Sequence, residues 1–266
     1  IEKTCMGRDG EFLQAALKRV GLDKTARLQI EDGRYEGYLE AHIEQGNYLE
    51  DAGEKIGIVS AIVGIRGLTV VFTGEQNHAG TTTMARRRDA ATALFNMASR
   101  INQQFPNIAN DRTVWTIGNV VIEPGAASII PGRAELTLQF RDQDEEILDQ
   151  LENIVGFIAT DINAKGIVKV EIEPARAPII PSKMSVKFRT EMQKSAELIV
   201  PNKWRHMPSA AGHDPMVINE KLPCGMLFIP SINGVSHNFQ EDSYDDDIIL
   251  GCQVLADAAA SILKQA

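Results

Sequence analysis

The middle of the chain repeats two hydrophobic patterns in an order that few folds share. Residues 133–141 alternate strictly, with Ala134, Leu136, Leu138 and Phe140 on one side, which predicts a half-buried strand. The predicted elements, in chain order, are strand 67–73, helix 86–104, strand 113–121, strand 133–141, helix 145–164 and strand 167–173. This β-α-β-β-α-β order predicts a ferredoxin-like α+β unit, which we assign to residues 64–176. Helices cover one face of such a sheet, so the other face is free for a partner or a cleft.

The segments on either side, residues 1–63 and 177–266, follow a different pattern. Their predicted elements are helix 9–20 closed by Gly21, strand 36–44, helix 186–200, a short buried strand at 225–229 and helix 245–264. Together they predict an α/β layer domain that is interrupted by the ferredoxin-like unit. This interpretation finds fewer strands than a self-sufficient sheet requires.

The acidic composition limits the classes of partner. The 266 residues include 27 Lys and Arg against 36 Asp and Glu, a net charge of −9, whereas nucleic-acid-binding domains usually carry a basic face. The one basic cluster, Arg86 to Arg88, precedes Asp89 and is predicted to begin a helix. Cys5, Cys224 and Cys252 follow no disulfide or zinc-ribbon spacing, which suits a reducing cytoplasm. No apolar run reaches membrane-spanning length, so neither nucleic acid nor membrane is an expected partner.

The five histidines are the residues best suited to chemistry. Four of them, His42, His78, His213 and His237, lie at predicted strand ends or in loops rich in Gly, Ser and Asn, and His206 has the least distinctive setting. Scaffolds usually present their working groups at such places. Imidazole is also the commonest metal ligand and a proton carrier near neutral pH.

Each of these histidines also has a purely structural interpretation. His42, in "YLEAHIEQG", could be a core histidine bonded to a backbone carbonyl, and for a single strand histidine that is the commoner case. His213 could simply precede a helix begun by Asp214 and Pro215, and the others could be turn or loop residues. Taken together, however, the four settings favour a metal-assisted hydrolase, since the sequence contains no GxSxG, phosphate-loop, GxGxxG or HExxH motif.

Several short motifs then occur in an order that resembles one family. They are "AHIEQG", "NHAGTT" followed by "RRDA", "IIPG" leading into "FRD", "AGHD", and "PSINGVSHN" with Glu241. The chain resembles the carbamoylase branch of the M20 metallohydrolases over nearly its whole length. That branch includes N-carbamoyl-L-amino acid hydrolases, β-ureidopropionase, and allantoate and ureidoglycolate amidohydrolases. The resemblance implies a zinc-peptidase-like α/β catalytic domain, formed by residues 1–63 and 177–266, with an inserted lid and dimerisation domain at 64–176.

The resemblance also implies a centre with two divalent metal ions. His42 would be a terminal ligand of one metal and His237 of the other. Zinc or manganese, with cobalt and nickel as further candidates, all suit such nitrogen and oxygen ligands.

The same resemblance implies roles in substrate binding for four further residues. Gln45 would contact the ureido group, Arg141 would clamp the substrate carboxylate with its planar fork, and His213 would line the pocket. His78 would reach over from the insert of a partner subunit to polarise the scissile carbonyl. The expected assembly is a homodimer through the lid, and the expected substrate is a small N-carbamoyl or ureido acid.

Two departures from the family pattern affect these expectations. Ser128 stands where the family usually has an Asn that donates to substrate, so substrate choice is open. The family's HxD and EE motifs, which supply the bridging aspartate, further metal ligands and the general base, would lie before Ile1, and no HxD occurs in the chain. The resemblance therefore implies the C-terminal portion of an enzyme, which would be inactive alone.

Two alternatives stay open at this point. One is an M20 aminoacylase or peptidase, which would use the same metals on an acyl-amino acid, although Gln45 and "NHAGTT" argue against it. The other is a non-catalytic, truncated chain that persists as a dimerising module. Activity on N-carbamoyl against N-acetyl amino acids, and the binding of divalent metal, would separate the three hypotheses.

Overall fold

A computed structural model describes residues 5–7, 10–26 and 28–265, which form two compact units, Ile1–Tyr35 and Glu36–Ala266. Among its described residues, the first unit contains one helix, α1 (Leu13–Arg19), followed by Gly21 in the left-handed conformation with φ 76°. The helix predicted at 9–20 is therefore present within residues 13–19, while residue 9 lies outside the described residues. All elements discussed below belong to the second unit.

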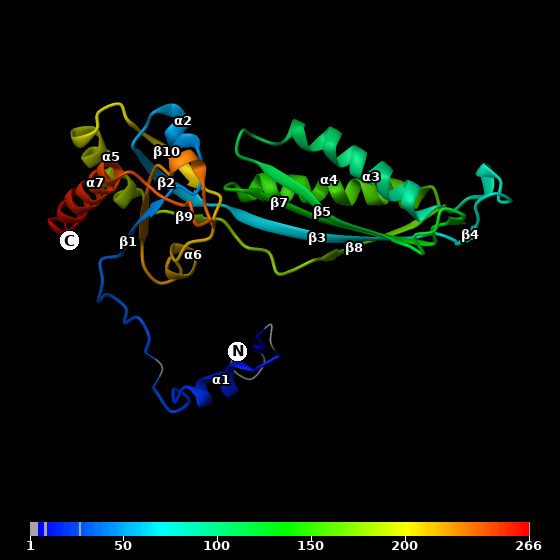
Figure 1. The fold of residues 1–266 in the computed structure, drawn as a ribbon, viewed down its shortest axis with the longest axis horizontal. Coiled ribbons are helices and arrows are strands. Elements are labelled where there is room, and N and C mark those ends of the chain that lie inside the picture. The colour runs from blue at the N-terminus through cyan, green and yellow to red at the C-terminus, as the bar shows by residue number, and fades with distance from the viewer. Residues whose placement is uncertain (1–4, 8–9, 27, 266) are drawn as a thin grey trace. The chain divides into compact units, whose positions relative to one another are not determined.

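The central part of the second unit is a four-stranded antiparallel sheet with strand order β5-β7-β3-β8. Its elements are β3 (Gly64–Thr73), α3 (Ala90–Gln104), β5 (Val114–Glu123), β7 (Arg133–Asp142), α4 (Glu145–Ala164) and β8 (Lys169–Pro174). Figure 1 shows α3 and α4 together on one side of this sheet. The β-α-β-β-α-β order predicted from the sequence is thus confirmed, and we call this region the four-stranded region.

Strand β7 shows why the prediction worked. Its residues alternate without exception between partly exposed and buried, with Ala134, Leu136, Leu138 and Phe140 all 0% exposed. These side chains pack with apolar residues of α3 and α4 in a single hydrophobic core. The polar side chains at alternate positions from Arg133 to Arg141 lie on the other face of the sheet, away from the helices.

The helix predicted to begin at Arg86 begins later. Met84–Arg86 form a single 3-10 turn, Arg87 is extended, and α3 starts at Ala90 after Asp89, whose side chain accepts a hydrogen bond from the Thr92 N–H. The physical reason is that Asp89 is the better N-cap. Within the basic cluster, Arg87 instead stabilises a loop, because its guanidinium donates to the carbonyl oxygens of Ala79 and Thr82. A two-stranded ribbon, β4 (Asn77–His78) with β6 (Ile129–Ile130), lies at this end of the region.

The second sheet has five strands and is mixed. Its path is β1 (Tyr38–Ile43), β11 (Cys224–Ile229), β2 (Ile56–Ile62) and β10 (Trp204–Ser209), with β9 (Ser182–Lys183) also pairing with β2. Helices α5 (Val186–Ile199) and α7 (Asp245–Leu263) pack on one face, against Leu227 and Ile229 among others. Met226 and Phe228, which alternate with those residues along β11, belong to a separate cluster on the other face. We call this the five-stranded region; it also carries the short helices α2 (Tyr48–Ala52) and α6 (Pro215–Ile218).

The expectation that the flanking segments have too few strands for a self-sufficient sheet was wrong, because β2 and β10 were missed. Strand β2 is almost wholly buried on both faces, so it shows no alternation of apolar and polar residues. It also runs almost directly into β3, with Val63 alone between them. The buried strand predicted at 225–229 is confirmed, since every residue of β11 is buried. The division of the chain at residues 63/64 and 176/177 stays a prediction.

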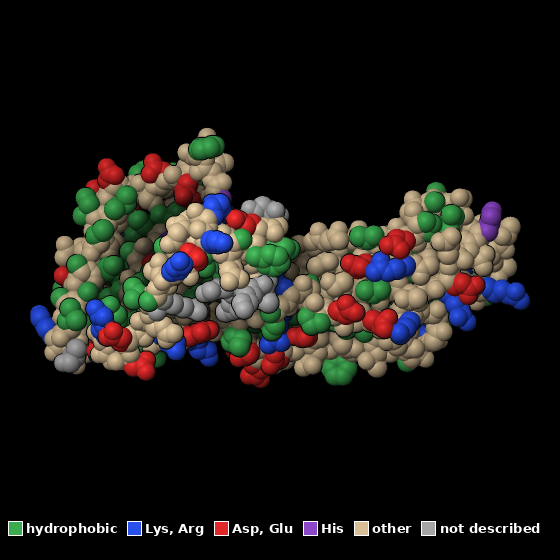
Figure 2. Space-filling view, turned by 90° about the horizontal axis from the view of Figure 1, so that it is seen from below, with side chains coloured by type: hydrophobic (Ala, Val, Ile, Leu, Met, Phe, Trp, Pro, Cys, Tyr) green, Lys and Arg blue, Asp and Glu red, His purple; other side chains and the backbone are tan. Residues whose placement is uncertain are grey.

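Two surface properties bear on possible partners. On the face shown in Figure 2, acidic and basic side chains are interspersed, without a continuous basic patch. Among the described residues, no helix is both long enough and apolar enough to cross a bilayer. The cysteines are unpaired, with Cys224 buried and the other two exposed.

Candidate active site

A cavity of about 600 Å³ brings residues of both regions together. Its lining from the five-stranded region includes His42, Glu44, Gln45, Gly46, Tyr48, Met207, Ala210, Ala211, Gly212, Phe228, Ser236 and His237, and from the four-stranded region Arg112, Val114 and Arg141. Four of the six site residues predicted from the sequence, His42, Gln45, Arg141 and His237, therefore line one cavity. The other two, His78 and His213, do not.

His42 is held on strand β1 with one ring nitrogen committed and one available. Its partner in the parallel register is Phe228, so it points to the face opposite α5 and α7. The Nδ1 atom lies 2.8 Å from the Ile43 carbonyl oxygen, and since a carbonyl only accepts, Nδ1 carries the proton. The lone pair then sits on Nε2. A backbone partner that fixes the tautomer in this way is typical of histidines that bind metals.

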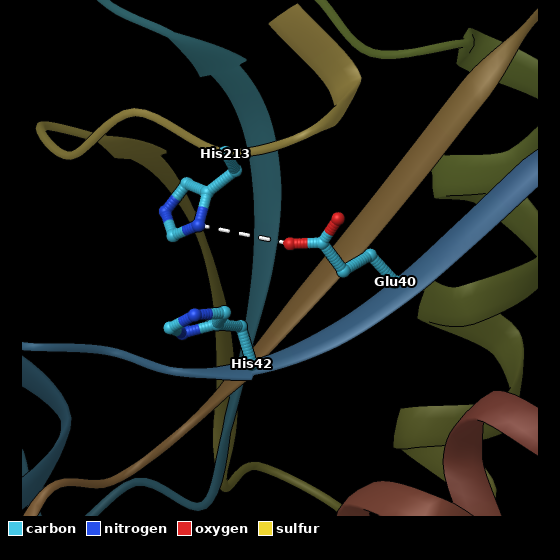
Figure 3. A group of neighbouring side chains, drawn as sticks. All are labelled: Glu40, His42 and His213. Atoms are coloured by element: carbon cyan, nitrogen blue, oxygen red, sulfur yellow. Dashed lines mark ion pairs between the residues drawn. The ribbon is translucent and has the colours of Figure 1, made fainter. Parts of the chain in front are cut away.

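Glu40 and His213 approach His42 from two sides, as Figure 3 shows. Glu40 lies two residues before His42 on the same strand and therefore on the same face, while His213 enters from the loop before α6. The His42 and His213 rings are edge to face with centroids 4.6 Å apart, and His213 Nδ1 is 3.6 Å from Glu40 Oε1. The ligand atoms of all three residues lie within 4.8 Å of one another, so this group could hold a metal ion.

The chemistry of His213 is that of a buried, neutral imidazole. Its side chain is 2% exposed, and Nε2 lies 2.8 Å from the Ser209 hydroxyl, itself buried. Burial, with a smaller contribution from His42, lowers the pKa of His213 to about 4. Burial also raises the pKa of Glu40, which accepts a hydrogen bond from the Tyr38 hydroxyl at 3.0 Å. His213 is therefore uncharged at neutral pH, and its contact with Glu40 is not an ion pair there. His213 directly follows the lining residues Ala210 to Gly212 but does not itself line the cavity.

Gln45 and His237 are joined by one hydrogen-bond network. Gln45 Nε2 donates to the Ser236 hydroxyl at 3.0 Å, and that hydroxyl donates to Glu241 Oε2 at 2.8 Å. The His237 backbone N–H donates to the same carboxylate oxygen at 3.0 Å. The Ser236 hydrogen bond, followed by that of His237, lowers the pKa of Glu241. Glu241 therefore fixes the loop that carries His237 and, through Ser236, the Gln45 amide.

The four-stranded region contributes two arginines to the cavity. Arg141, on the polar face of β7, donates from Nε and Nη2 to Gln139 Oε1 and from Nη1 to the Ala210 carbonyl oxygen at 3.1 Å. Arg112 lies in the loop before β5, with its guanidinium carbon 3.9 Å from the centroid of the Tyr48 ring. Across the described residues, neither arginine forms an ion pair. Sequence analysis missed Arg112, since an arginine in a loop carries no signal of its own.

His78 lies far from this cavity within the chain. Strand β3 has ten residues and joins the two ends, with Gly64 opposite Asp142 beside the cavity and Thr73 opposite Arg133 near the β4–β6 ribbon (Figure 1). At the usual rise per residue these ends are about 30 Å apart. His78 Nδ1 accepts hydrogen bonds from the N–H groups of Gly80 and Thr81, so the ring proton is on the exposed Nε2. The ring is thus prepared as a donor, at the opposite end from Arg141.

Comparison with known proteins gives consistent results. The family model described as "Peptidase family M20/M25/M40" matches residues 12–261. The chain is 35% identical over 260 residues to allantoate amidohydrolase of Escherichia coli (strain K12), which covers 96% of this chain and 61% of that protein. It is 34% identical over 255 residues to N-carbamoyl-L-amino acid amidohydrolase of Geobacillus stearothermophilus, covering 94% and 61% respectively.

A solved structure gives the same picture of the fold. The crystal structure of an amidase of the hydantoinase/carbamoylase family from Burkholderia phymatum matches with a TM-score of 0.88 and 39% sequence identity. The match covers 98% of this chain and 63% of that chain. The zinc-peptidase-like α/β fold expected from the motifs is therefore confirmed. The chain spans a little under two thirds of the length of these relatives, and the expectation that it is the C-terminal portion of an enzyme stays a prediction.

Proposed function

The chain belongs to peptidase family M20/M25/M40. On that premise we propose that its residues contribute the active site of a metal-dependent hydrolase of N-carbamoyl amino acids or related ureido acids. The reaction would cleave a C–N bond of the carbamoyl group rather than a peptide bond. One observation carries the proposal: a single cavity contains imidazole, amide and guanidinium groups, from His42 and His237, Gln45, and Arg141. Those are the groups needed to hold a metal, a ureido group and a carboxylate.

The residues present fit a divalent metal. His42 offers a free Nε2 lone pair, His237 lines the same cavity, and Glu40 and His213 lie close behind His42. Nitrogen and oxygen donors of this kind suit zinc, manganese, cobalt or nickel. When bound, such an ion would act as a Lewis acid toward the scissile carbonyl. His42 and His237 are the ligands that we propose from this chain.

Gln45 supports a ureido substrate over an acyl one. Because its Nε2 donates to Ser236, its Oε1 is left to accept hydrogen bonds. A carbamoyl group ends in an NH₂ that can donate to this oxygen, whereas an acyl group ends in carbon. Arg141 would bind the substrate carboxylate through its guanidinium fork, which suits a planar, bidentate partner.

His78 would complete the site from a second copy of the chain. Within its own chain, His78 is separated from the cavity by the length of strand β3, about 30 Å. Only a partner subunit could therefore bring its Nε2–H to the substrate. There it would donate to the oxygen on which negative charge develops, a contribution typically worth about 3 kcal/mol. The dimer would form through the four-stranded region, which would act as the lid.

The test is the release of ammonia by the purified full-length protein with added zinc or manganese. Allantoate, ureidoglycolate and N-carbamoyl-L-amino acids are compared with N-acetyl-L-amino acids. Ammonia release from the carbamoyl or ureido compounds supports the proposal. Deacetylation without ammonia release would instead identify an aminoacylase or peptidase. A protein that dimerises but neither binds divalent metal at micromolar concentration nor turns over any of these substrates would be a non-catalytic module.

Mixing two inactive variants tests the role of His78. In a His42→Ala and His78→Ala mixture, each mixed dimer contains one cavity with His42 intact that receives His78 from the other subunit. Random re-association should therefore restore about a quarter of the wild-type activity. If the mixture stays as inactive as the separate variants, His78 does not act across the subunit boundary.

A further inference from the structure

We propose that Arg112 is a second anion-binding residue of the cavity, and that the preferred substrate is a ureido acid with two carboxylates. An N-carbamoyl derivative of an acidic amino acid belongs to this class. The inference rests on the function proposed above, since it specifies which member of the substrate class the cavity takes. It arises from a contact between the two regions that neither the motifs nor the relatives' names point to.

The position of Arg112 is set by strand register. Val114 at the start of β5 is paired with Arg141 near the end of β7, and Arg112 precedes Val114 by two residues. The two guanidiniums therefore come from the same end of the same pair of strands. Both line the cavity that also contains His42 and Gln45.

A buried carboxylate stabilises the loop that carries Arg112. Asp142 is 0% exposed, and its Oδ2 accepts hydrogen bonds from the Thr113 hydroxyl at 2.6 Å and from Asn110 Nδ2 at 3.1 Å. Asn110 Oδ1 in turn accepts from the Arg112 N–H at 2.7 Å. A loop with these internal bonds presents its arginine in one place, and a binding residue whose position is fixed in advance loses less entropy on binding.

The Tyr48 ring fixes the other end of the Arg112 side chain. Its centroid lies 3.9 Å from the guanidinium carbon, within the range of a cation–π contact. That contact uses the face of the guanidinium and leaves the N–H groups at its edge free to donate in its plane. A guanidinium stacked in this way is oriented but its donors are not used up.

The residues that line the cavity carry more positive than negative charge. Glu44 is the one carboxylate among the described lining residues, and both its oxygens accept from the N–H groups of Tyr48 and Leu49, each at 2.9 Å. Arg112 and Arg141 have no ion-pair partner among the described residues. One substrate carboxylate would satisfy Arg141, and Arg112 would then select a second.

A purely structural role for Arg112 predicts something different. If the Arg112–Tyr48 contact only joins the two regions, removing the guanidinium should lower stability without changing the selectivity for anions. Tyr48→Phe keeps the stacking face, so it should retain selectivity under either view. Arg176→Gln is a matched control, because it removes the same charge from an exposed arginine outside the cavity.

Binding of two simple probes tests the inference apart from catalysis. Succinate and butyrate have the same carbon number but differ by one carboxylate, and their affinities for the 266-residue protein can be compared by calorimetry. We expect succinate to bind at least about tenfold more tightly, in line with a charge-assisted hydrogen bond, and we expect Arg112→Gln to abolish that preference. Arg176→Gln and Tyr48→Phe should keep it. Equal binding of the two probes by the wild type, or an unchanged preference in Arg112→Gln, would overturn the inference.

Kinetics then separates this inference from the proposed function. The measured quantity, for the full-length protein, is the ratio of kcat/KM for N-carbamoyl-L-aspartate to that for N-carbamoyl-L-alanine, which should fall by about tenfold or more in Arg112→Gln. Hydrolysis of both substrates with an unchanged ratio would reject the role of Arg112 and leave the function standing. If neither is hydrolysed while succinate is still preferred, the proposed function fails and the anion site remains.

Discussion

The two regions distribute their polar groups in opposite ways. The five-stranded region gathers His42, Gln45 and His237 around one cavity, through strand β1, the loop that follows it and the loop that follows its neighbour β11. The four-stranded region separates Arg141 from His78 by the length of a ten-residue strand, about 30 Å. An antiparallel sheet of long strands has functional loops at both ends, and only one end can face a given cavity. The first region therefore brings its polar groups to one cavity, while the second has Arg141 at that cavity and His78 far from it.

The largest effect is expected from the core of the four-stranded region. Phe140 is 0% exposed in that core, so Phe140→Ala should lower the free energy of unfolding by about 3–5 kcal/mol. The hydrophobic clusters of the two regions are separate, and each region has one tryptophan, Trp115 and Trp204. Urea unfolding in single-tryptophan variants should thus show the Trp115 transition shifted more than that of Trp204.

The control for this experiment is Phe157→Ala. Phe157 lies on α4 in the same region but is 70% exposed, so the change should stay within about 0.5 kcal/mol. Equal shifts of both tryptophan signals in Phe140→Ala would show that the two regions unfold as one cooperative unit. The two regions would then differ in where their polar groups lie, but not in stability.

The next largest effect distinguishes His42, which lines the cavity, from His78, at the far end of the four-stranded region. His42→Ala should weaken the binding of zinc or manganese by about a hundredfold. Removing a residue that only hydrogen-bonds to a ligand already lowers metal affinity, and removing the ligand itself should lower it more. His78→Ala should leave the affinity unchanged, because His78 does not line the cavity. Isothermal titration measures both, with His206→Ala, at an exposed position of β10, as a control. Wild-type affinity in His42→Ala would remove it from the metal site.

A smaller effect is expected from the carboxylate beneath the Arg112 loop. Asp142→Ala would leave the Thr113 hydroxyl, Asn110 Nδ2 and the Asp144 N–H without their acceptor. Unsatisfied donors of this kind cost about 1–3 kcal/mol, which chemical denaturation can measure. Succinate binding should weaken in parallel if the loop positions the cavity's arginine. Asp161→Ala, on the exposed face of α4, should do neither.

The smallest effect is a pH dependence confined to the five-stranded region. The hydrogen bond from Lys194, 2.7 Å from the carboxylate, lowers the pKa of Glu191 below its usual 4.5. The contribution to stability is therefore present above pH 4.5 and is lost as the pH falls through the folded-state pKa. Glu191→Gln should lower Tm by about 1–2 °C at pH 7, and by progressively less as the pH falls through the folded-state pKa. In a Lys194→Met background the difference at pH 7 should disappear; if it persists there, another partner is responsible.

The sequence predicted the four-stranded region well for a physical reason. Its strands are half buried and its helices amphipathic, so burial leaves a periodic pattern, most clearly in β7. Strand β2 is buried on both faces and has no period, and β10 contains the adjacent polar residues Arg205 and His206, which break any alternation. Their place in the sheet depends on neighbours far away in the chain, which a local pattern does not contain.

The same limit applies to the candidate site. The motifs identified His42, Gln45, Arg141 and His237, which the fold brings to one cavity, although their roles remain proposals. Glu40 could have been found from its position two residues before His42 on one face of a strand. Arg112 could not, because its significance lies in the Tyr48 ring and the buried Asp142, and only tertiary structure joins them.

Two of the cavity's residues occupy strained backbone. Gln45 and His237 have φ values of 59° and 55°, in the left-handed region that favours glycine. A side chain held there raises the energy of the folded state by about 1 kcal/mol or more. Gln45→Gly and His237→Gly would relieve that strain and raise thermal stability, yet each would delete a group that faces the cavity. Selection for heat resistance alone would therefore favour the loss of these two side chains, and with them the binding roles proposed for them.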